Sequence, residues 1–245
     1  MNYSRNARYF RPAPSPKSGI IFIVIGILLL GIGAANSIGA PIAIGVVLIA
    51  LGGLILYFKY SNIPSDQEID RLAGELAKDI KSSALKKLGL EEEEISMAEP
   101  IMFYGWGFFE DGRRPLHDES LGRAWDVQRN GVWRAPVVEL HFFGFSENMI
   151  HYYCKCISLV SSTYREDTDE YFYKDIVSVK TGTADFACYD FAKNKEDPSR
   201  HVIADTFRLT STGGTSISCK VHNHSQAEQS VNAMRNLLKQ KKLES

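Results

Sequence analysis

The strongest hydrophobic pattern in the chain runs from Ser18 to Tyr60, with no charged residue between Lys17 and Lys59. About 18 consecutive apolar residues are enough for a membrane-spanning helix, so this stretch is long enough for two. Its apolar character is interrupted by Asn36, Ser37, Gly39 and Pro41. The pattern therefore predicts a transmembrane hairpin within residues 18–60, with helices over residues 19–35 and 42–58.

Basic residues flank the predicted hairpin on both sides. They are Arg5, Arg8, Arg11 and Lys17 before it and Lys59 at its end, and the loop between the spans has none. Because cytoplasmic flanks carry an excess of Lys and Arg, both termini are expected in the cytoplasm. Residues 1–17 also contain alternating prolines and are expected to form a disordered basic arm. A signal peptide cleaved after Ala35 is a weaker alternative, because a second apolar run follows at once.

Glycines recur every seven residues in both predicted spans. They are Gly19, Gly26 and Gly33 in the first and Gly45 and Gly52 in the second. A stripe of small residues on one helix face lets two backbones approach closely. The stripe is expected to pack one helix of the hairpin on the other, and the alternative is a seam for homo-oligomers. Neither span holds an ionisable residue, which argues against a transport pathway within one protomer.

A helix is predicted directly after the hairpin, within a linker of residues 61–95. Ser65 and Glu68 have the spacing of a capping box, and Gly89 is a suitable left-handed stop. Apolar residues recur at helical spacing between them: Ile69, Leu72, Ala73, Leu76, Ala77, Ile80 and Ala84. This stalk helix needs a partner for its apolar face, either the following domain or a neighbouring protomer.

Residues 96–245 change to short segments rich in aromatic and β-branched residues, separated by turn residues. Seven strands are expected, at residues 100–109, 132–145, 149–160, 169–180, 184–191, 202–210 and 215–222. A second capping box at Ser225 and Glu228 precedes an apolar stripe of Ala227, Val231, Met234 and Leu238. This stripe predicts a C-terminal helix that packs on the strands.

Three segments of this region resemble the pleckstrin-homology (PH) and GRAM-like domains of bacterial membrane proteins. They are Phe142–Tyr153, Tyr171–Val179 and Phe207–Leu238. The resemblance implies two packed sheets that form an open barrel, with a C-terminal helix across one end. Together with the hairpin, it predicts a membrane-anchored α+β protein of the bacterial inner membrane. The connection over residues 111–134 is longer than a common loop between the first two strands of such a domain.

The net charge of −1 hides an asymmetry along the chain. Residues 1–60 hold five of the 28 basic residues and none of the 29 acidic ones, which leaves 23 basic against 29 acidic residues in the remainder. A mildly acidic domain is not expected to bind nucleic acid. The expected partners are the lipid bilayer and either a membrane-associated protein or an anionic small ligand.

The connection over residues 111–134 is the strongest candidate for a ligand site. It holds Arg113, Arg114, Arg123, Arg129 and Arg134 together with Trp125 and Trp133. Arginine binds phosphate through two parallel hydrogen bonds, and tryptophan suits stacking and the membrane interface. Four acidic residues among them, Asp111, Asp118, Glu119 and Asp126, make a salt-bridged structural loop the favoured alternative.

No metal site, cofactor or catalytic motif is expected. Cys154, Cys156 and Cys219 with His222 and His224 do not have zinc-ribbon spacing, and free buried thiols are the expected state of all four cysteines. His141 and His151 alternate with aromatic residues and are expected to be structural. Phosphate-binding loops, nucleophile elbows and zincin helices are absent from the sequence.

Two functions remain open. The first is a non-enzymatic inner-membrane protein that presents a cytosolic PH-like domain to a protein partner or an anionic headgroup. Tethering would raise its effective concentration for membrane-bound partners. The second is a ligand-gated effector of the anti-phage type, in which the barrel senses a signalling nucleotide and drives the hairpins to assemble and disrupt the membrane.

Overall fold

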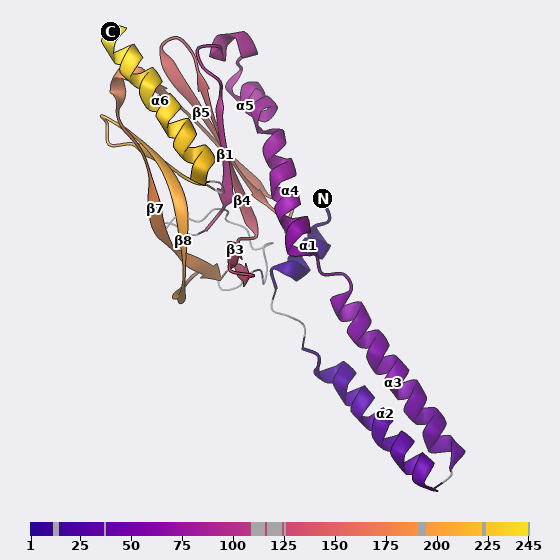
Figure 1. Cartoon of the computed structure of the whole chain (residues 1–245). Coiled ribbons are helices and arrows are strands. Elements are labelled where there is room, and N and C mark those ends of the chain that lie inside the picture. Colours follow the sequence, from indigo (N-terminus) through magenta and orange to yellow (C-terminus); the bar gives the residue numbers. More distant parts are fainter. Residues whose placement is uncertain are drawn as a thin grey trace. The chain divides into compact units, whose positions relative to one another are not determined.

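The computed structural model describes residues 1–11, 15–36, 38–108, 116, 124, 126–190, 195–221 and 224–244, without the side chains of residues 189–190, 195–200, 224–227 and 244. The chain divides into two compact units. One consists of Met1–Phe10 with Ser65–Ser245, and the other is Arg11–Pro64. The protein is of the α+β class, with two long apolar helices near the N-terminus and antiparallel sheets beyond them (Figure 1).

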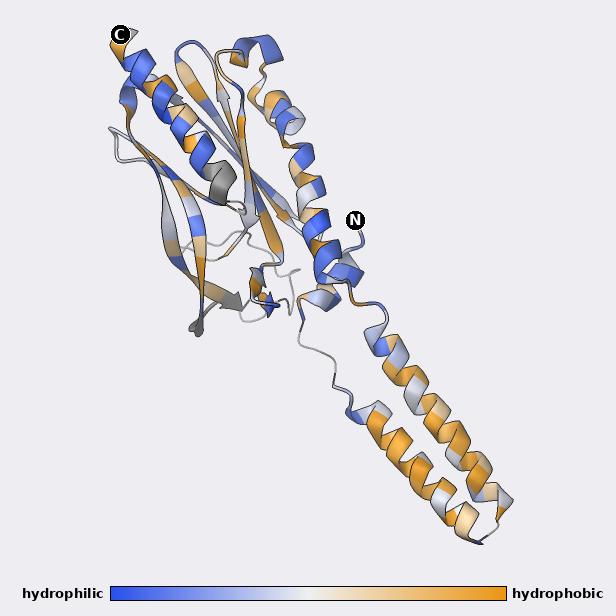
Figure 2. Cartoon of the chain, in the orientation of Figure 1, coloured by the Kyte–Doolittle hydropathy of each residue, from blue (hydrophilic) through white to orange (hydrophobic). Residues whose placement is uncertain are grey.

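The smaller unit is a pair of helices, α2 (Lys17–Asn36) and α3 (Gly39–Tyr60). Both are long and apolar enough to cross a membrane, and Figure 2 shows them as the most continuously hydrophobic part of the chain. Each helix extends slightly beyond its predicted bounds. Pro41 is accommodated because it lies in the first turn of α3, where a backbone N–H has no helical partner to lose.

The five glycines with seven-residue spacing form the contact between α2 and α3. Gly19, Gly26 and Gly33 are buried on α2, and Gly45 and Gly52 are buried on α3. A Cβ atom added at Gly26 would lie 2.7 Å from the carbonyl oxygen of Gly45, and one added at Gly52 would lie 2.7 Å from that of Gly19. Within one hairpin these glycines are thus covered by the other helix, as the intramolecular interpretation expects.

The first ten residues differ from the expected disordered arm. Tyr3–Tyr9 form a short helix, α1, which Asn2 caps by accepting a hydrogen bond from the backbone N–H of Arg5. Tyr9 and Phe10 are fully buried in the larger unit. Prolines and basic residues are typical of a disordered segment, and they suggested one here. The surface that buries the two aromatic rings is built by segments far away in sequence, so residues 1–17 alone do not reveal it.

The expected stalk helix is two helices, α4 (Asp66–Lys78) and α5 (Ile80–Leu88), with the break at Asp79. The predicted capping box is confirmed, since Ser65 and Glu68 bond each other's backbone N–H groups. Gly89 ends α5 with a φ of +71°, also as predicted. A 3-10 turn, η1 (Glu92–Ile95), follows.

The apolar face of these two helices packs on the sheet of the same unit. Ile69, Ala73, Ile80 and Ala84 are almost fully buried, and the helices contact β1, β4 and β5. Of the two partners left open by the sequence, the following domain is therefore the one observed. A stalk would have left these residues exposed.

The described strands form three antiparallel sheets. The largest has the order β1 (Ile101–Trp106), β4 (Val137–Phe145), β5 (Met149–Ser158) and β6 (Tyr164–Phe172). The second consists of β7 (Ile176–Asp190), β8 (Lys195–Ser211) and β9 (Ser216–Lys220). A small hairpin pairs β2 (Val127–Arg129) with β3 (Val132–Arg134). The last helix, α6 (His224–Glu244), packs on β7, β8 and the 3-10 turn η3 (Tyr173–Asp175).

The described part of the chain thus has nine strands where seven were expected. The predicted strand over residues 169–180 is interrupted by η3, where Tyr173 is buried and its hydroxyl donates to the carbonyl oxygen of Ser146. The break expected between residues 180 and 184 does not occur, because β7 continues through it. The predicted stripe on the last helix is buried at Val231, Met234 and Leu238.

Strand β4 is buried along its whole length because both of its faces are covered. Residues such as Phe142 and Gly144 face the side of α5 and η1, where a Cβ on Gly144 would touch Ile95. The alternate residues face the second sheet, where Phe143 packs against Phe207 with ring centres 5.1 Å apart. Glu139 and His141 lie on the same face of β4 as Phe143. Their side chains therefore also point into the interior between the two sheets.

Candidate functional site

Of the residues predicted to bind a ligand, Arg113, Arg114, Arg123 and Trp125 lie outside the described residues. Arg129, Trp133 and Arg134 are described and lie on the small β2–β3 hairpin. This hairpin turns at Asn130 and Gly131, both with positive φ, which is the backbone conformation that an Asn-Gly hairpin turn adopts. The structure brings the two arginines together with α1 and α4.

Arg134 is buried and forms a two-pronged ion pair with α4. Its Nε and Nη2 atoms donate to the two carboxylate oxygens of Asp70 at 2.6 and 2.7 Å, and Nη1 lies 3.9 Å from Asp66 Oδ2. The paired carboxylate of Asp70 outweighs burial and raises the pKa of Arg134. The two parallel donors of this guanidinium are thus already bonded to Asp70 of the protein itself.

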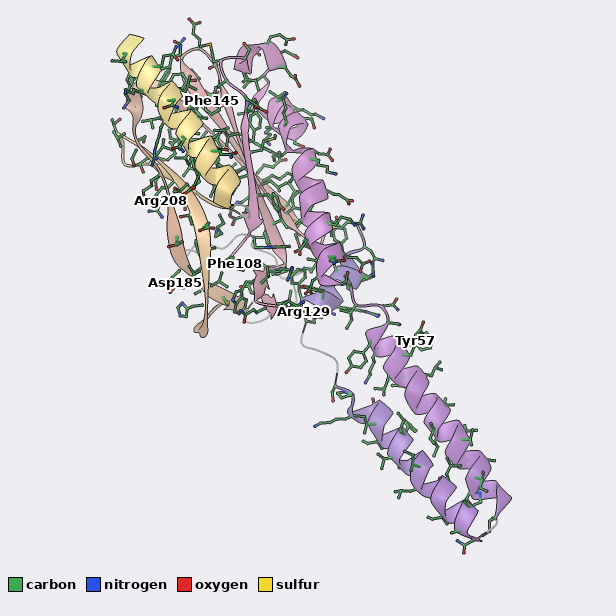
Figure 3. All side chains as sticks on the ribbon, viewed as in Figure 1. Tyr57, Phe108, Arg129, Phe145, Asp185 and Arg208 are labelled. Carbon is green, nitrogen blue, oxygen red and sulfur yellow. The ribbon has the colours of Figure 1, made fainter. Side chains whose placement is uncertain are left out.

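Arg129 contacts the N-terminal helix. Its guanidinium carbon lies 4.3 Å from the centre of the Tyr9 ring, in cation–π geometry. The Tyr9 hydroxyl donates to Asp66 Oδ1 at 2.8 Å, and Asn130 Nδ2 donates to the other oxygen of Asp66 at 2.9 Å. Burial and the bond to Asp66 raise the pKa of Tyr9 to about 12. The described part of the predicted site, with Arg129 labelled in Figure 3, therefore holds α1 and α4 in place.

All four cysteines are free and buried, as expected. No group of three or more potential metal ligands occurs among the residues that the structure describes. His222, and the side chain of His224, lie outside those residues. His151 Nδ1 lies 3.0 Å from Glu170 Oε1, and its Nε2 lies 3.0 Å from Ser146 Oγ. Both ring nitrogens are thus engaged within the protein, as a structural histidine requires.

A cavity of about 970 Å³ lies between the inner faces of the two larger sheets. Its volume is at the upper end of the range usual for small-molecule sites. Strands β4, β5 and β6 form one wall, and β8, β9 and the turn between them form the other. It is lined by Phe108, Glu139, His141, Tyr152, Cys154, Cys156, Arg165, Asp167, Asp169, Tyr171, Arg208, Gly213, Gly214, Thr215, Ser216, Ile217, Ser218 and Lys220. Figure 3 labels two of the lining residues, Phe108, which follows β1, and Arg208 of β8.

A buried ion pair crosses from one wall of the cavity to the other. Lys220 Nζ lies 3.2 Å from both carboxylate oxygens of Glu139 and 5.0 Å from the centre of the Phe186 ring. Burial opposes ionisation of Glu139, but Lys220 and His141 outweigh it and hold the pKa of this carboxyl below its usual value. Two opposite charges are thus buried inside the domain, and each would be unfavourable there without the other.

His141 lies beside this pair and is only 2% exposed. Its Nδ1 is 2.9 Å from the Tyr152 hydroxyl, whereas Nε2 has no hydrogen-bond partner among the described residues and lies 3.7 Å from Glu139 Oε2. Burial opposes protonation, yet Cys219, Tyr152 and Glu139 raise the pKa of His141 well above its ordinary value. Ser218 Oγ is a second buried atom without a partner among the described residues.

The rim of the cavity carries exposed charges on β6. Arg165 Nε donates to Asp167 Oδ2 at 3.0 Å, and Asp169 Oδ2 accepts from the Tyr171 hydroxyl at 2.5 Å. On the other side, Thr215 and Ser216 of the β8–β9 turn are also exposed. The cavity therefore opens to solvent between β6 and this turn, while Glu139, His141 and Lys220 lie at its buried base.

Glu139 and Lys220 were not among the site residues expected from the sequence. Their signal was present, because the run Val137-Val138-Glu139-Leu140-His141-Phe142-Phe143 places two polar residues at alternate positions of an otherwise apolar strand. In a strand buried on both faces, polar residues in register must face a polar partner or a cavity. The partner, Lys220, is 81 residues away, and no local pattern pairs it with Glu139.

Comparison of the chain with protein-family models, with curated proteins and with solved structures found no match.

Proposed function

We propose that this chain is a two-span membrane protein whose folded unit binds a small polar ligand in the cavity between its sheets. We assign this folded unit to the PH-like class. That assignment is supported by a four-stranded and a three-stranded antiparallel sheet followed by a C-terminal helix. The resemblance noted in the sequence supports a bacterial inner membrane as the location of the protein.

Contacts within the larger unit support the two-span topology. Tyr9 precedes α2 and Asp66 follows α3, and the two side chains are hydrogen-bonded to each other. The residues on either side of the apolar pair thus belong to one folded body, which requires an even number of membrane crossings. Basic flanks at Arg11, Lys17 and Lys59 favour the cytoplasm for that body.

The cavity is the observation that carries the binding proposal. Its volume of about 970 Å³ is that of a small-molecule site, and its lining carries ionisable side chains of both signs. They are Glu139, Asp167, Asp169, Arg165, Arg208 and Lys220. A polar ligand would therefore find both hydrogen-bond donors and acceptors along the walls.

Binding is favoured over catalysis by the state of the nucleophiles in the cavity. A hydrogen bond with Cys154 and burial raise the pKa of the Cys156 thiol, which keeps it protonated. Burial likewise raises the pKa of Tyr152 well above its usual value. Thiols and phenols are weak nucleophiles in these protonated forms.

The effector alternative has less support than the binding proposal. Assembly through the glycine stripe would need Gly19, Gly26 and Gly33 to be accessible, but α3 covers them within one hairpin. A small ligand in the cavity could still regulate a partner protein in the membrane. The protein would then sense a ligand, as in the effector alternative, without disrupting the membrane.

The binding proposal is tested with the full chain, purified in detergent and analysed for co-purifying small molecules by native mass spectrometry and by extraction. Thr215→Trp places an indole at the mouth of the cavity, whereas Thr212→Trp lies in the same turn outside the cavity lining. We expect a bound molecule in the wild type and in Thr212→Trp, and its loss in Thr215→Trp. Equal recovery from all three proteins would contradict the proposal.

A further inference from the structure

We propose that a second site, a groove between β7 and α6, binds a phosphate monoester. The groove has a volume of about 310 Å³ and lies where α6 runs along β7 (Figure 1). Residues 177–179 of β7 line one side, and Arg235, Leu238, Lys239 and Lys242 of α6 line the other. The groove shares no lining residue with the cavity between the sheets, so this inference does not depend on the proposed function.

The lining of the groove carries three positive charges and no negative one. Arg235, Lys239 and Lys242 follow one another at the spacing i, i+4 and i+7, so they lie on one face of α6. Like charges at this spacing destabilise a helix. An anion bound in the groove would relieve that repulsion.

Stability of the helix does not account for these cations. A cation stabilises the C-terminal end of a helix only within its last turn, whereas Arg235 and Lys239 lie more than one turn before Glu244, where α6 ends. Neither side chain forms an ion pair with a carboxylate of the described residues. Their charge is therefore available to a ligand.

Hydrogen bonds to β7 hold two of the cations at the groove. Arg235 Nε donates to the carbonyl oxygen of Val179 at 3.0 Å, and Lys242 Nζ donates to that of Ile176 at 2.6 Å. The two Nη groups of Arg235 have no partner among the described residues. Side chains that are ordered before binding lose less entropy on binding, and parallel N–H groups of arginine match two oxygens of a phosphate.

The rest of the lining favours an ester over a bare ion. Val177 is 56% exposed, and Val179 and Leu238 also line the groove. The carbon skeleton of an ester would cover this apolar surface, which inorganic phosphate would leave in water. A phosphate monoester has a charge of about −1.5 to −2 at pH 7, which suits three cations better than the single charge of a carboxylate or a phosphodiester.

The test titrates glycerol 3-phosphate into the full chain in phosphatidylcholine nanodiscs and measures binding by isothermal titration calorimetry. Salt at about 0.15 M limits the attraction between distant exposed charges. We expect the wild type to bind glycerol 3-phosphate more tightly than inorganic phosphate. The double variant Arg235→Gln with Lys239→Gln, at two exposed positions, should weaken binding by about tenfold or more.

Two control variants locate the probe. Lys78→Gln removes an exposed charge from α4, outside the groove, and should bind as the wild type does. Thr215→Trp obstructs the cavity between the sheets and should also leave binding unchanged. Absence of binding in the wild type, equal affinity for inorganic phosphate, or the same loss in Lys78→Gln as in the double variant would overturn the inference. Loss in Thr215→Trp would place the probe in the cavity and would also overturn it.

A soluble phosphate ester and a lipid headgroup share this chemistry, and a second titration distinguishes them. It compares nanodiscs that contain phosphatidic acid, a monoester, with nanodiscs that contain an equal charge of phosphatidylglycerol, a diester. Loss of glycerol 3-phosphate binding only with phosphatidic acid would identify the headgroup as the ligand. Equal binding in both nanodiscs would identify the soluble ester, and either result would support the groove as a site for a phosphate monoester.

Discussion

Tyr9 and Asp66 are hydrogen-bonded to each other across the entire apolar segment of the chain. The Tyr9 hydroxyl oxygen and Asp66 Oδ1 are 2.8 Å apart although the residues are separated by 57 positions, and α2 and α3 lie between them in the sequence. Asp66 also accepts a hydrogen bond from Asn130 Nδ2, and the Arg129 guanidinium lies over the Tyr9 ring. The start and the end of the hairpin are thereby held to one folded unit.

Removing the Tyr9 hydroxyl should weaken this connection measurably. Tyr9→Phe keeps the ring and its contact with Arg129 but leaves Asp66 without one donor, so the free energy of unfolding should fall by about 1–3 kcal/mol. Urea unfolding of the full chain in detergent measures the change. Tyr3→Phe, at the half-buried start of α1, should be close to wild type. An equal loss in both variants would show that the bond contributes nothing specific.

The same relationship makes a prediction about topology. Cysteines introduced at Arg8 and Glu147, both exposed positions, should react with a membrane-impermeant maleimide from the same side of the membrane. The four natural cysteines are buried and should give a low background. We expect labelling of both sites in inside-out vesicles and protection of both in intact cells. Labelling from opposite sides would refute a hairpin whose two ends meet.

The buried pair of Glu139 and Lys220 should be sensitive to the loss of one partner and tolerant to the loss of both. Glu139→Leu leaves the Lys220 ammonium buried beside Phe186 without its carboxylate, and should cost about 3–5 kcal/mol of stability. The double variant Glu139→Leu with Lys220→Met replaces both charges by apolar groups of similar size and should recover most of that loss. A double-mutant cycle from thermal or urea unfolding measures the coupling. Additive losses would contradict a direct pair.

Acid should destabilise the wild type through the same carboxyl. Its pKa is below the ordinary 4.5 because Lys220 from β9 and His141 from β4 face it, with Cys156 of β5 nearby. A lowered pKa contributes stability that is fully present above the unfolded-state value and is lost as the pH falls through the folded-state value. Between about pH 5.5 and 3 the unfolding free energy of the wild type should fall more steeply than that of the double variant. Parallel pH profiles would rule out this linkage.

Local patterns were sufficient to predict most of the helical segments, although not α1. The apolar run predicted α2 and α3, the Ser65–Glu68 spacing predicted the cap of α4, and Gly89 predicted the end of α5. These features depend on neighbours within one or two turns of helix, which a sequence displays directly. The break at Asp79 was not predicted, because it has no glycine or proline and the apolar stripe continues through it.

The cavity and the contacts of the arginines could not be predicted in the same way. Arg134 pairs with Asp70 and Lys220 with Glu139, over separations of 64 and 81 residues. The sequence shows which charges exist but not which of them meet, so the composition of residues 111–134 left both a salt-bridged structural loop and a ligand site open. In the structure Arg129 and Arg134 are engaged internally. The polar positions in β4 were the one local indication of the cavity, since a buried strand rarely carries Glu and His in register without a reason.

The glycine contact between α2 and α3 supplies a final prediction. Leucine at Gly26 would bring a side chain against the Gly45 carbonyl and Ile49, both 2.7 Å from the position of a Cβ atom, and would force the helices apart. Leucine at Gly31 meets open space on the same helix and serves as the control. In detergent micelles titrated with dodecyl sulfate, Gly26→Leu should lose helical circular dichroism at a lower mole fraction of dodecyl sulfate than Gly31→Leu or wild type. Because small residues drive such packing in the absence of a hydrophobic force between helices, equal midpoints for the three proteins would mean that the stripe does not hold the hairpin together.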